Sequence, residues 1–206
     1  MKTIENRGGA DRRAVAEAVE ALDKGEIIIY PTDTLYAFGC DALNSRAIER
    51  LCRLKGINPE KNCLSIVCSD VSQAAEYARI DNNAFRLLKH YLPGPFTFIL
   101  PAATTLPKVF KGRKTVGIRI PDCEFARELA RESGHPVLTS SVPADEEAGE
   151  DDTTDGHAVA IRYEGITDIS LTIDGGESSG EASTVVDCTD SGSPEIIRQG
   201  AGIFDE

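Results

Sequence analysis

The sequence contains no long apolar run. A membrane-spanning helix needs about 20 predominantly apolar residues, and no segment of the chain approaches that length. Residues 1–5 (MKTIE) also lack the apolar core of a signal peptide. The hydrophobic share of 41% and the charged share of 27% are typical of a soluble globular protein. The sequence therefore predicts a cytoplasmic protein that has no membrane partner.

The chain also lacks internal repeats and any linker-like stretch that would divide it. Its 206 residues are enough to bury a core without disulfides or metals. We therefore expect residues 1–206 to form a single domain.

Metal-binding patterns are missing as well. No two cysteines form a Cys-x-x-Cys pair, and the three histidines are scattered along the chain. Dispersed cysteines in a cytoplasmic protein are most often small buried hydrophobes. We expect no metal site from these six, which are Cys40, Cys52, Cys63, Cys68, Cys123 and Cys188.

Basic charge is scarce: 22 lysines and arginines face 34 acids, which gives a net charge of −12. Seven of the acids lie in residues 144–155 (ADEEAGEDDTTD), a block without a base that predicts a solvated loop. The rest of the chain is still acidic. Proteins that grip duplex phosphates normally carry the opposite charge, so the composition disfavours tight, unaided RNA binding.

Apolar periodicity and turn signals divide the chain into alternating strands and helices. This pattern indicates an α/β fold, with a twisted mixed sheet and flanking helices. Ser45 is predicted to cap one helix, and Ser69 or Asp70 another. The expected helices cover 11–24, 45–54, 70–77, 81–92 and 124–132. The expected strands cover 26–30, 64–68, 96–100, 115–120, 137–139, 169–174, 183–187 and 195–198.

The segment PTDT (31–34) follows the apolar strand 26–30. Thr32 and Thr34 should therefore lie at the carboxyl end of a strand, where open α/β sheets bind ligands. A helix is expected next, with Lys55 at its end. Hydroxyl groups and a cation suit a phosphate or a carboxylate. The alternative is an ordinary strand, turn and helix in which the threonines satisfy the turn backbone.

Five segments occur in an order that resembles the YrdC/YciO family. The resemblance runs from about residue 4 to residue 203, and the IRQGAG ending close to the last residue is similar to the short, single-domain YciO branch. It implies a twisted α/β fold around a deep concave pocket. The segments are IIIYPTDTLYAFGCDA (27–42), LCRLKG (51–56), LPGPFTFIL (92–100), TVGIRIPD (115–122) and ASTVVDCTDSGSPEIIRQGAG (182–202).

The resemblance implies substrates and partners. In the synthase members the pocket binds ATP with Mg²⁺, L-threonine and bicarbonate, and it makes threonylcarbamoyl-adenylate. That compound supplies the threonylcarbamoyladenosine found beside the anticodon of certain tRNAs. A tRNA or a tRNA-modifying protein is therefore a further implied partner.

Site residues follow position by position from the same resemblance. Lys55 and Arg119 are implied as catalytic, since one grips nucleotide phosphates and the other the threonine carboxylate, for which a bidentate guanidinium is well suited. Substrate binding is implied for Thr32, Thr34, Arg119, Ser141 and Ser183. Nucleotide binding is implied for Lys55, Thr115 and Arg198.

Three positions depart from the family pattern. Ile57 stands where a Lys-x-Arg pair has its arginine, Pro143 where a Ser-x-Asn motif has its amide, and Cys68 at a position that is often histidine. A charge-assisted contact contributes ~1.5–3 kcal/mol, so these losses predict weak synthase activity. The candidates to replace the missing charge are Lys61, Arg113 and Lys114.

Two other functions stay open beside weak synthesis of the adenylate. One is hydrolytic processing of the modified tRNA nucleotide, which needs the hydroxyl-lined pocket but no strong triphosphate grip. The other is a non-catalytic protein that binds double-stranded RNA.

Each site residue also has a structural alternative. Arg119 suits an exposed strand position, Lys55 suits the negative end of a helix dipole, and Ser141 suits a turn cap. Two further groups are expected to be structural. Asp174 and Asp187 should order turns after strands rather than bind Mg²⁺. Phe96 and Phe98 should lie in the core rather than stack on bases.

Overall fold

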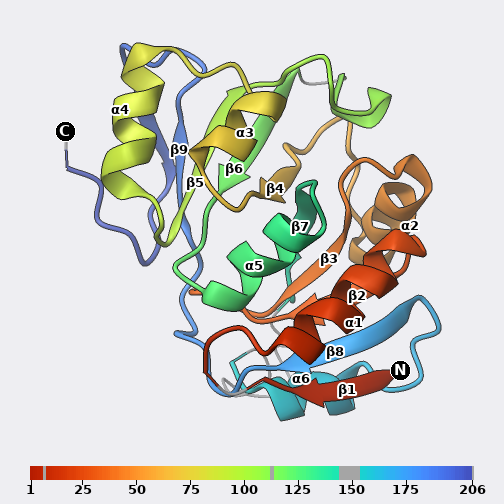
Figure 1. Ribbon diagram of the computed structural model, residues 1–206. Coiled ribbons are helices and arrows are strands. Elements are labelled where there is room, and N and C mark those ends of the chain that lie inside the picture. The colour runs from red at the N-terminus through yellow and green to blue at the C-terminus, as the bar shows by residue number, and fades with distance from the viewer. Residues whose placement is uncertain (7, 112–113, 144–153, 206) are drawn as a thin grey trace.

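The strands of this protein form one mixed sheet (Figure 1). The computed structural model describes residues 1–206 except 7, 112–113, 144–153 and 206. The strand order is β1-β8-β2-β3-β7-β4-β6-β5-β9-β10, which confirms the predicted α/β fold with a mixed sheet. The bounds are β1 Lys2–Glu5, β2 Ile27–Tyr30, β3 Ala37–Asp41, β4 Ser65–Val67, β5 Phe96–Pro101, β6 Thr115–Arg119, β7 Val137–Ser141, β8 Ile169–Asp174, β9 Thr184–Asp187 and β10 Glu195–Arg198.

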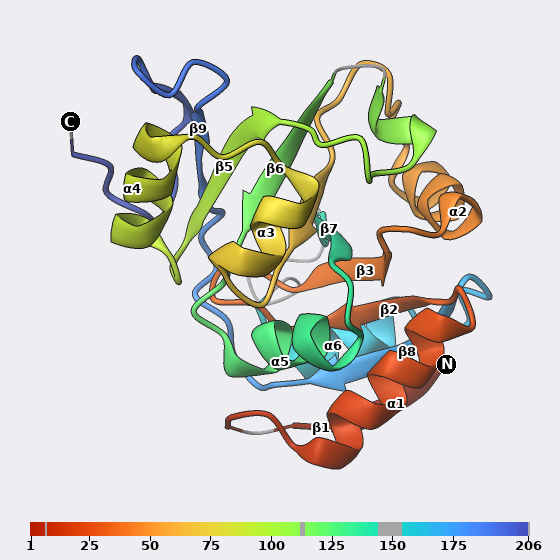
Figure 2. The ribbon, with the colours of Figure 1, turned by 45° about the horizontal axis from the view of Figure 1, so that its top comes forward.

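Helices flank this sheet. In Figures 1 and 2, α1 and α5 lie side by side near β2 and β8, while α3 and α4 lie over the part formed by β5 and β6. Among the described residues, no helix is long and apolar enough to cross a membrane. The bounds are α1 Arg12–Asp23, α2 Ser45–Lys55, α3 Val71–Tyr77, α4 Asn82–Tyr91, α5 Glu124–Glu132 and α6 Gly156–Arg162, with a short 3₁₀ helix over Lys108–Lys111.

Strand β2 separates two hydrophobic cores. Successive side chains of a strand point to opposite faces of the sheet. Ile28 and Tyr30 accordingly pack with α1 and α5, whereas Ile27 and Ile29 pack with residues of α2 and β3. All four side chains are fully buried, so the sheet is covered on both faces at this point.

The chain after β2 differs from the predicted strand, turn and helix. Residues 31–36 connect β2 to the antiparallel strand β3, in which Gly39 lies opposite Ile28, and α2 follows β3. A Cβ atom at Gly39 would lie 2.7 Å from Cε1 of Tyr30, which explains the glycine at this position. The PTDT segment therefore lies in the connection where the chain reverses direction between β2 and β3.

Helix α6 was not predicted, and it begins directly after the expected acidic loop. Most of the 144–155 stretch lies outside the described residues. Asp155, at its end, is the N-cap of α6, and its Oδ1 accepts from the backbone N of Ala158 at 2.8 Å. Asp155 thus lies just before the helix, and the expected loop ends where α6 begins.

The cap of α2 lies one residue before the predicted position. Oδ1 of Asn44 accepts from the backbone N of Arg46 at 3.1 Å and of Ala47 at 3.2 Å, and Ser45 is the first helical residue. We expect Asn44→Ala to lower the free energy of unfolding by about 1 kcal/mol, because two helical N–H groups lose their acceptor. Ser45→Ala should change it by less than about 0.5 kcal/mol. Urea denaturation measures both, and equal effects of the two substitutions would contradict this assignment.

Candidate functional site

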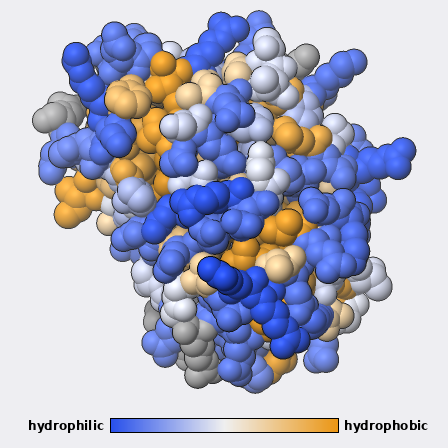
Figure 3. Space-filling view, viewed as in Figure 1, coloured by the Kyte–Doolittle hydropathy of each residue, from blue (hydrophilic) through white to orange (hydrophobic). Residues whose placement is uncertain are grey.

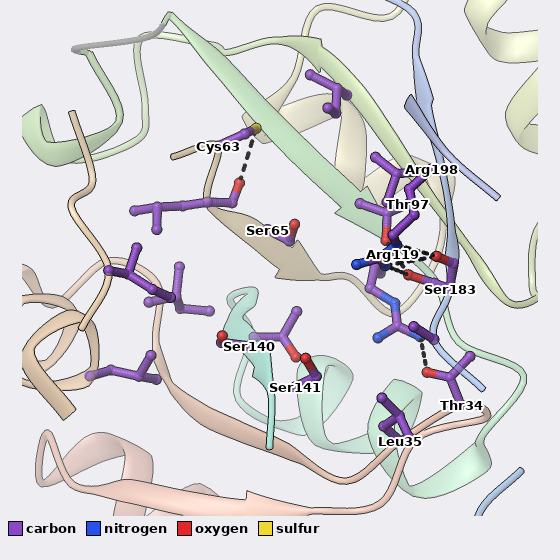
Figure 4. A pocket seen from close by; sticks show the side chains of 18 residues that line it. Thr34, Leu35, Cys63, Ser65, Thr97, Arg119, Ser140, Ser141, Ser183 and Arg198 are labelled. Atoms are coloured by element: carbon purple, nitrogen blue, oxygen red, sulfur yellow. Dashed lines mark hydrogen bonds between the residues drawn. The ribbon is translucent and has the colours of Figure 1, made fainter. Parts of the chain in front are cut away.

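A cavity of about 240 Å³ lies where the PTDT connection meets the ends of several strands (Figure 4). Its lining includes residues of the connection after β2, of the strands β4, β5, β6 and β7, and of β9 and β10. Five residues that the resemblance implied as site residues line this cavity, and they come from segments far apart in the sequence. They are Thr34, Arg119, Ser141, Ser183 and Arg198.

Arg119 is the buried cation of the cavity. It is 7% exposed, so the alternative of an exposed strand residue is wrong. Its Nη2 donates to Oδ1 of Asp33 at 2.9 Å and to Oγ1 of Thr34 at 3.0 Å. Its Nε is buried and has no hydrogen-bond partner among the described residues. A buried donor without a partner is costly, and a ligand acceptor in the cavity would relieve that cost.

Asp33 holds this guanidinium in place and was not recognised from the sequence. Its side chain is 8% exposed, and its Oδ2 accepts from the backbone N of Asp122 at 2.9 Å. The carboxylate therefore joins the PTDT connection to the end of β6 and the start of α5. In the sequence, an aspartate between two threonines is typical of a turn. Only the three-dimensional structure shows that it pairs with Arg119.

Thr32 and Thr34 differ in what their hydroxyl groups contact. Oγ1 of Thr32 donates to the carbonyl of Leu35 at 2.7 Å and lies 3.0 Å from Oγ1 of Thr34. Thr32 therefore satisfies the turn, as the structural alternative expected, and it does not line the cavity. Thr34 lines it beside Arg119.

Ser183, Arg198 and Thr97 line the cavity close to Arg119 (Figure 4). Oγ of Ser183 lies 2.9 Å from Oγ1 of Thr97, a residue that the sequence analysis had not singled out. Nη2 of Arg198 donates to the carbonyl of Ser183 at 2.7 Å. Arg198 is exposed, so its charge stands at the edge of the cavity rather than inside it.

Lys55 and Thr115 do not line the cavity. Lys55 ends α2, and its Nζ donates to the carbonyl of Ser141 at 2.5 Å, so it contacts a cavity-lining residue of β7 rather than only its own helix end. Burial, and to a smaller extent the charge of Arg162, lowers the pKa of Lys55. Oγ1 of Thr115 lies 3.7 Å from Sγ of Cys63, which does line the cavity.

The three departures from the family pattern have different surroundings. Ile57 lines the cavity and gives it an apolar wall. Pro143 is exposed, and its carbonyl accepts from Nη1 of Arg162 at 2.7 Å. Cys68 is fully buried in the core, and burial raises the pKa of its thiol. Cys68 therefore cannot present a polar group to the cavity.

The residues expected to be structural are structural. Oδ1 of Asp174 accepts from the backbone N of Gly176 at 2.9 Å, and Oδ1 of Asp187 from that of Thr189 at 2.8 Å. Phe96 and Phe98 lie in the core with ring centroids 5.7 Å apart. The turn roles of the two aspartates and the core positions of the two phenylalanines are therefore confirmed.

A larger hollow of about 710 Å³ lies between α1 and α5. Figure 3 shows the face of the molecule that carries these helices, which is largely hydrophilic with a few apolar patches. Val15 and Val19 line this hollow together with Glu124 and Glu128. None of the implied site residues lies there, so the smaller cavity is the candidate site.

The lining of the smaller cavity limits its chemistry. Its described lining residues include hydroxyls and two guanidinium groups, but no carboxylate and no histidine. Such a site can bind and orient an anionic ligand and neutralise charge. Among the described residues, no group of three or more histidines, cysteines or acids could hold a metal ion. A Mg²⁺ ion that arrives with substrate phosphates needs few protein ligands, so this lining is compatible with it.

A family model described as "Telomere recombination", for the Sua5, YciO and YrdC proteins, matches residues 20–200. The chain belongs to this family. It is 40% identical over 192 residues to an uncharacterized protein of Haemophilus influenzae, covering 92% of this chain and 90% of that protein. It is 35% identical over 193 residues to YciO of Escherichia coli (93% and 91%). A threonylcarbamoyl-AMP synthase of Bacillus subtilis is 34% identical over 190 residues (90% and 53%).

Two solved structures of this family have the same fold. The crystal structure of E. coli YciO gives a TM-score of 0.85 at 33% identity and covers 98% of this chain and 96% of that one. Sua5 of P. abyssi in complex with L-threonine gives a TM-score of 0.85 at 31% identity, covering 97% and 58%. The chain thus spans nearly all of YciO and little more than half of Sua5. These comparisons confirm the predicted family and its YciO branch.

Proposed function

We propose that this protein binds a nucleotide and a threonine-derived group and slowly forms threonylcarbamoyl-adenylate. The observation that carries the proposal is the buried Arg119 beside Thr34 in the cavity, with a guanidinium Nε that lacks a partner among the described residues. A related Sua5 chain that covers 97% of this one was solved with L-threonine. A guanidinium presents a planar fork to a carboxylate such as that of threonine.

The reaction needs little acid–base chemistry from the protein. The amine of threonine attacks CO₂ derived from bicarbonate and releases a proton to solvent, and the oxygen of the resulting carbamate then attacks the α-phosphorus of ATP. The bond from that phosphorus to the β-phosphate oxygen breaks, and pyrophosphate leaves. Arg119 and Thr34 would hold the threonine, and Lys55 and Arg198 would face the nucleotide. Most of the rate acceleration would come from positioning and charge neutralisation.

The nucleotide would extend from the cavity towards its edge. Ser183 and Ser141 offer hydroxyls at the wall, and Arg198 stands exposed beside Ser183. When bound, Mg²⁺ would neutralise the charge on the phosphates of ATP. The product would then be passed to a tRNA-modifying protein, because its adenylate bond is reactive and the chain's net charge of −12 disfavours direct tRNA binding.

One observation favours hydrolysis of the modified tRNA nucleotide as a second candidate function. Ile57 gives the cavity an apolar wall where the resemblance implies an arginine. The absence of this arginine weakens binding of a triphosphate, whereas hydrolysis needs only the threonine subsite and a water molecule. The non-catalytic RNA-binding alternative has no comparable support.

The proposal is tested by incubating the protein with ATP, Mg²⁺, L-threonine and bicarbonate. We expect pyrophosphate and the adenylate to form in equal amounts and slowly. Arg119→Lys should weaken L-threonine binding about 10-fold or more in calorimetry, because the fork is lost while the charge opposite Asp33 remains. Arg46→Lys, at an exposed position of α2, is the matched control and should bind like the wild type. A wild-type protein that binds neither L-threonine nor ATP would refute the proposal.

A further inference from the structure

The hollow of about 710 Å³ between α1 and α5, here called the α1–α5 groove, has an apolar floor and an acidic wall. Val15 and Val19 of α1 form the floor, and Val15 is only 3% exposed. Figure 3 shows apolar surface where Figure 1 places α5 and α1, bordered by hydrophilic side chains. Glu124, Glu128 and Glu132 of α5 form the wall. The groove can therefore receive an apolar side chain that is flanked by cations.

The acidic wall is unfavourable as long as the groove is empty. Glutamates at a spacing of four residues repel one another along one face of a helix, and the negative end of the helix dipole disfavours Glu132 in the last turn. Glu128 pairs with Arg131, but among the described residues no ion pair involves Glu124 or Glu132. Arg12, at the start of α1, is the one cation of the described lining. Cations from outside the chain would offset this repulsion.

Positive charge without acids collects in a different stretch of the chain. Residues 82–121 contain no aspartate or glutamate, although the whole chain has 34 acids. Two of the cations that the sequence offered in place of the missing phosphate contact belong to it. Lys114 is exposed and outside the cavity lining, and Arg113 lies outside the described residues. Helix α4 (Asn82–Tyr91) begins this stretch and is therefore a helix without acids.

The exposed side of α4 complements the α1–α5 groove. Phe85 is 49% exposed, and Arg86 and Lys89 beside it are exposed as well. Among the described residues, no ion pair involves Arg86 or Lys89. These three residues, here called the α4 face, present an aromatic ring together with two unpaired cations. Aromatic residues and arginine are the usual anchors of protein–protein interfaces.

The α4 face and the α1–α5 groove lie on opposite sides of α5. In Figures 1 and 2, α5 lies between α4 and α1. Phe85 and Lys89 line a separate hollow of about 290 Å³ together with Arg127 of α5, whereas the groove lies towards α1. A two-fold axis that passes over α5 places the α4 face of one copy opposite the groove of the other. The same contact then forms twice, as in a closed symmetric dimer.

We propose that two copies of this chain form a symmetric dimer in which the α4 face of each lies in the α1–α5 groove of the other. Phe85 of each copy contacts the apolar floor of the groove. Arg86 and Lys89 approach the glutamates of its wall, so both sets of unpaired charges gain partners. The net charge of −12 opposes association at long range, but salt screens charges that are more than about 8 Å apart at physiological ionic strength.

Charge reversal tests this pairing, with sedimentation velocity over a concentration series as the measurement. We expect the wild type to dimerise reversibly, and Arg86→Glu/Lys89→Glu to weaken the dimer by about 100-fold or more. Glu124→Lys/Glu132→Lys should weaken it similarly, although two changes of +2 each move the net charge from −12 to −8 and lower the general repulsion. The variant with all four substitutions should recover dimerisation, because opposite charges face each other again.

Two further variants complete the test. Arg46→Glu/Lys108→Glu reverses two exposed cations outside both surfaces and should dimerise like the wild type. Phe85→Ala should weaken the dimer by about 10-fold or more, because it removes the aromatic anchor. Far-UV circular dichroism verifies that each variant is folded. A wild type that is monomeric at every concentration, or a dimer that persists in Arg86→Glu/Lys89→Glu, would overturn the inference. A monomer whose groove binds a basic amphipathic peptide would also overturn it and assign the groove to a different protein.

Discussion

Asp33→Ala is expected to lower the free energy of unfolding by about 3–5 kcal/mol, because it leaves Arg119 as a buried cation without its carboxylate. The side chains of the pair are 8% and 9% exposed, so water cannot take the place of the carboxylate easily. The substitution also removes the acceptor of the Asp122 backbone N. Urea denaturation with matched slopes measures the loss, and calorimetry with L-threonine measures the accompanying loss of affinity.

The double variant Asp33→Ala/Arg119→Met separates stability from binding. Removing both charges from a buried pair is often close to neutral, so most of the lost stability should return. Binding of L-threonine should not return, since the guanidinium is gone. A single variant Asp33→Ala that unfolds within about 1 kcal/mol of the wild type would show that the pair is not the buried contact described here.

Much of the fold could be predicted because each of its elements has a local signal. The strand β2 is a run of four apolar residues, and α1 repeats its buried side chains at helical spacing. The missed elements lack such signals. Strand β1 is short and largely exposed. Helix α6 follows an acidic stretch whose composition is typical of a loop. Strand β3 was not predicted, because a helix was expected directly after the PTDT turn.

The site could be predicted only through a resemblance, because its contacts join distant parts of the chain. Arg119 and Asp33 are 86 positions apart, and β3, β7 and β4 lie between β2 and β6 in the sheet, so only the folded chain brings the connection after β2 to the end of β6. The resemblance to the family correctly implied that Thr34, Arg119 and Ser183 lie at the cavity. It did not indicate that the hydroxyl of Thr32 bonds to the turn backbone instead. It also missed Asp33, whose role depends on its pairing with Arg119 across distant parts of the chain.

Ile57→Arg with Pro143→Asn should raise the rate of adenylate formation, measured as kcat/KM for ATP, by about 10- to 100-fold. The first change adds a guanidinium to a wall of the cavity, and one charge-assisted contact to a phosphate contributes ~1.5–3 kcal/mol. The second adds an amide after Ser141 and keeps the carbonyl that accepts from Arg162. Pyrophosphate release under saturating L-threonine and bicarbonate gives the rate.

A matched control is Ile203→Arg, which adds the same charge at a position that is 76% exposed and outside the cavity lining. It should leave the rate at the wild-type value, since added charge at a distance is screened by salt. Wild-type turnover as fast as that of the double variant would contradict the premise that Ile57 limits synthesis.

A double variant that binds L-threonine but forms no adenylate would favour hydrolysis, and incubation with threonylcarbamoyladenosine-containing tRNA decides that case. Release of a threonine-derived product that disappears in Arg119→Lys but persists in Lys55→Ala would assign the cavity to hydrolysis, because both functions share the threonine subsite and only synthesis depends on binding of the triphosphate.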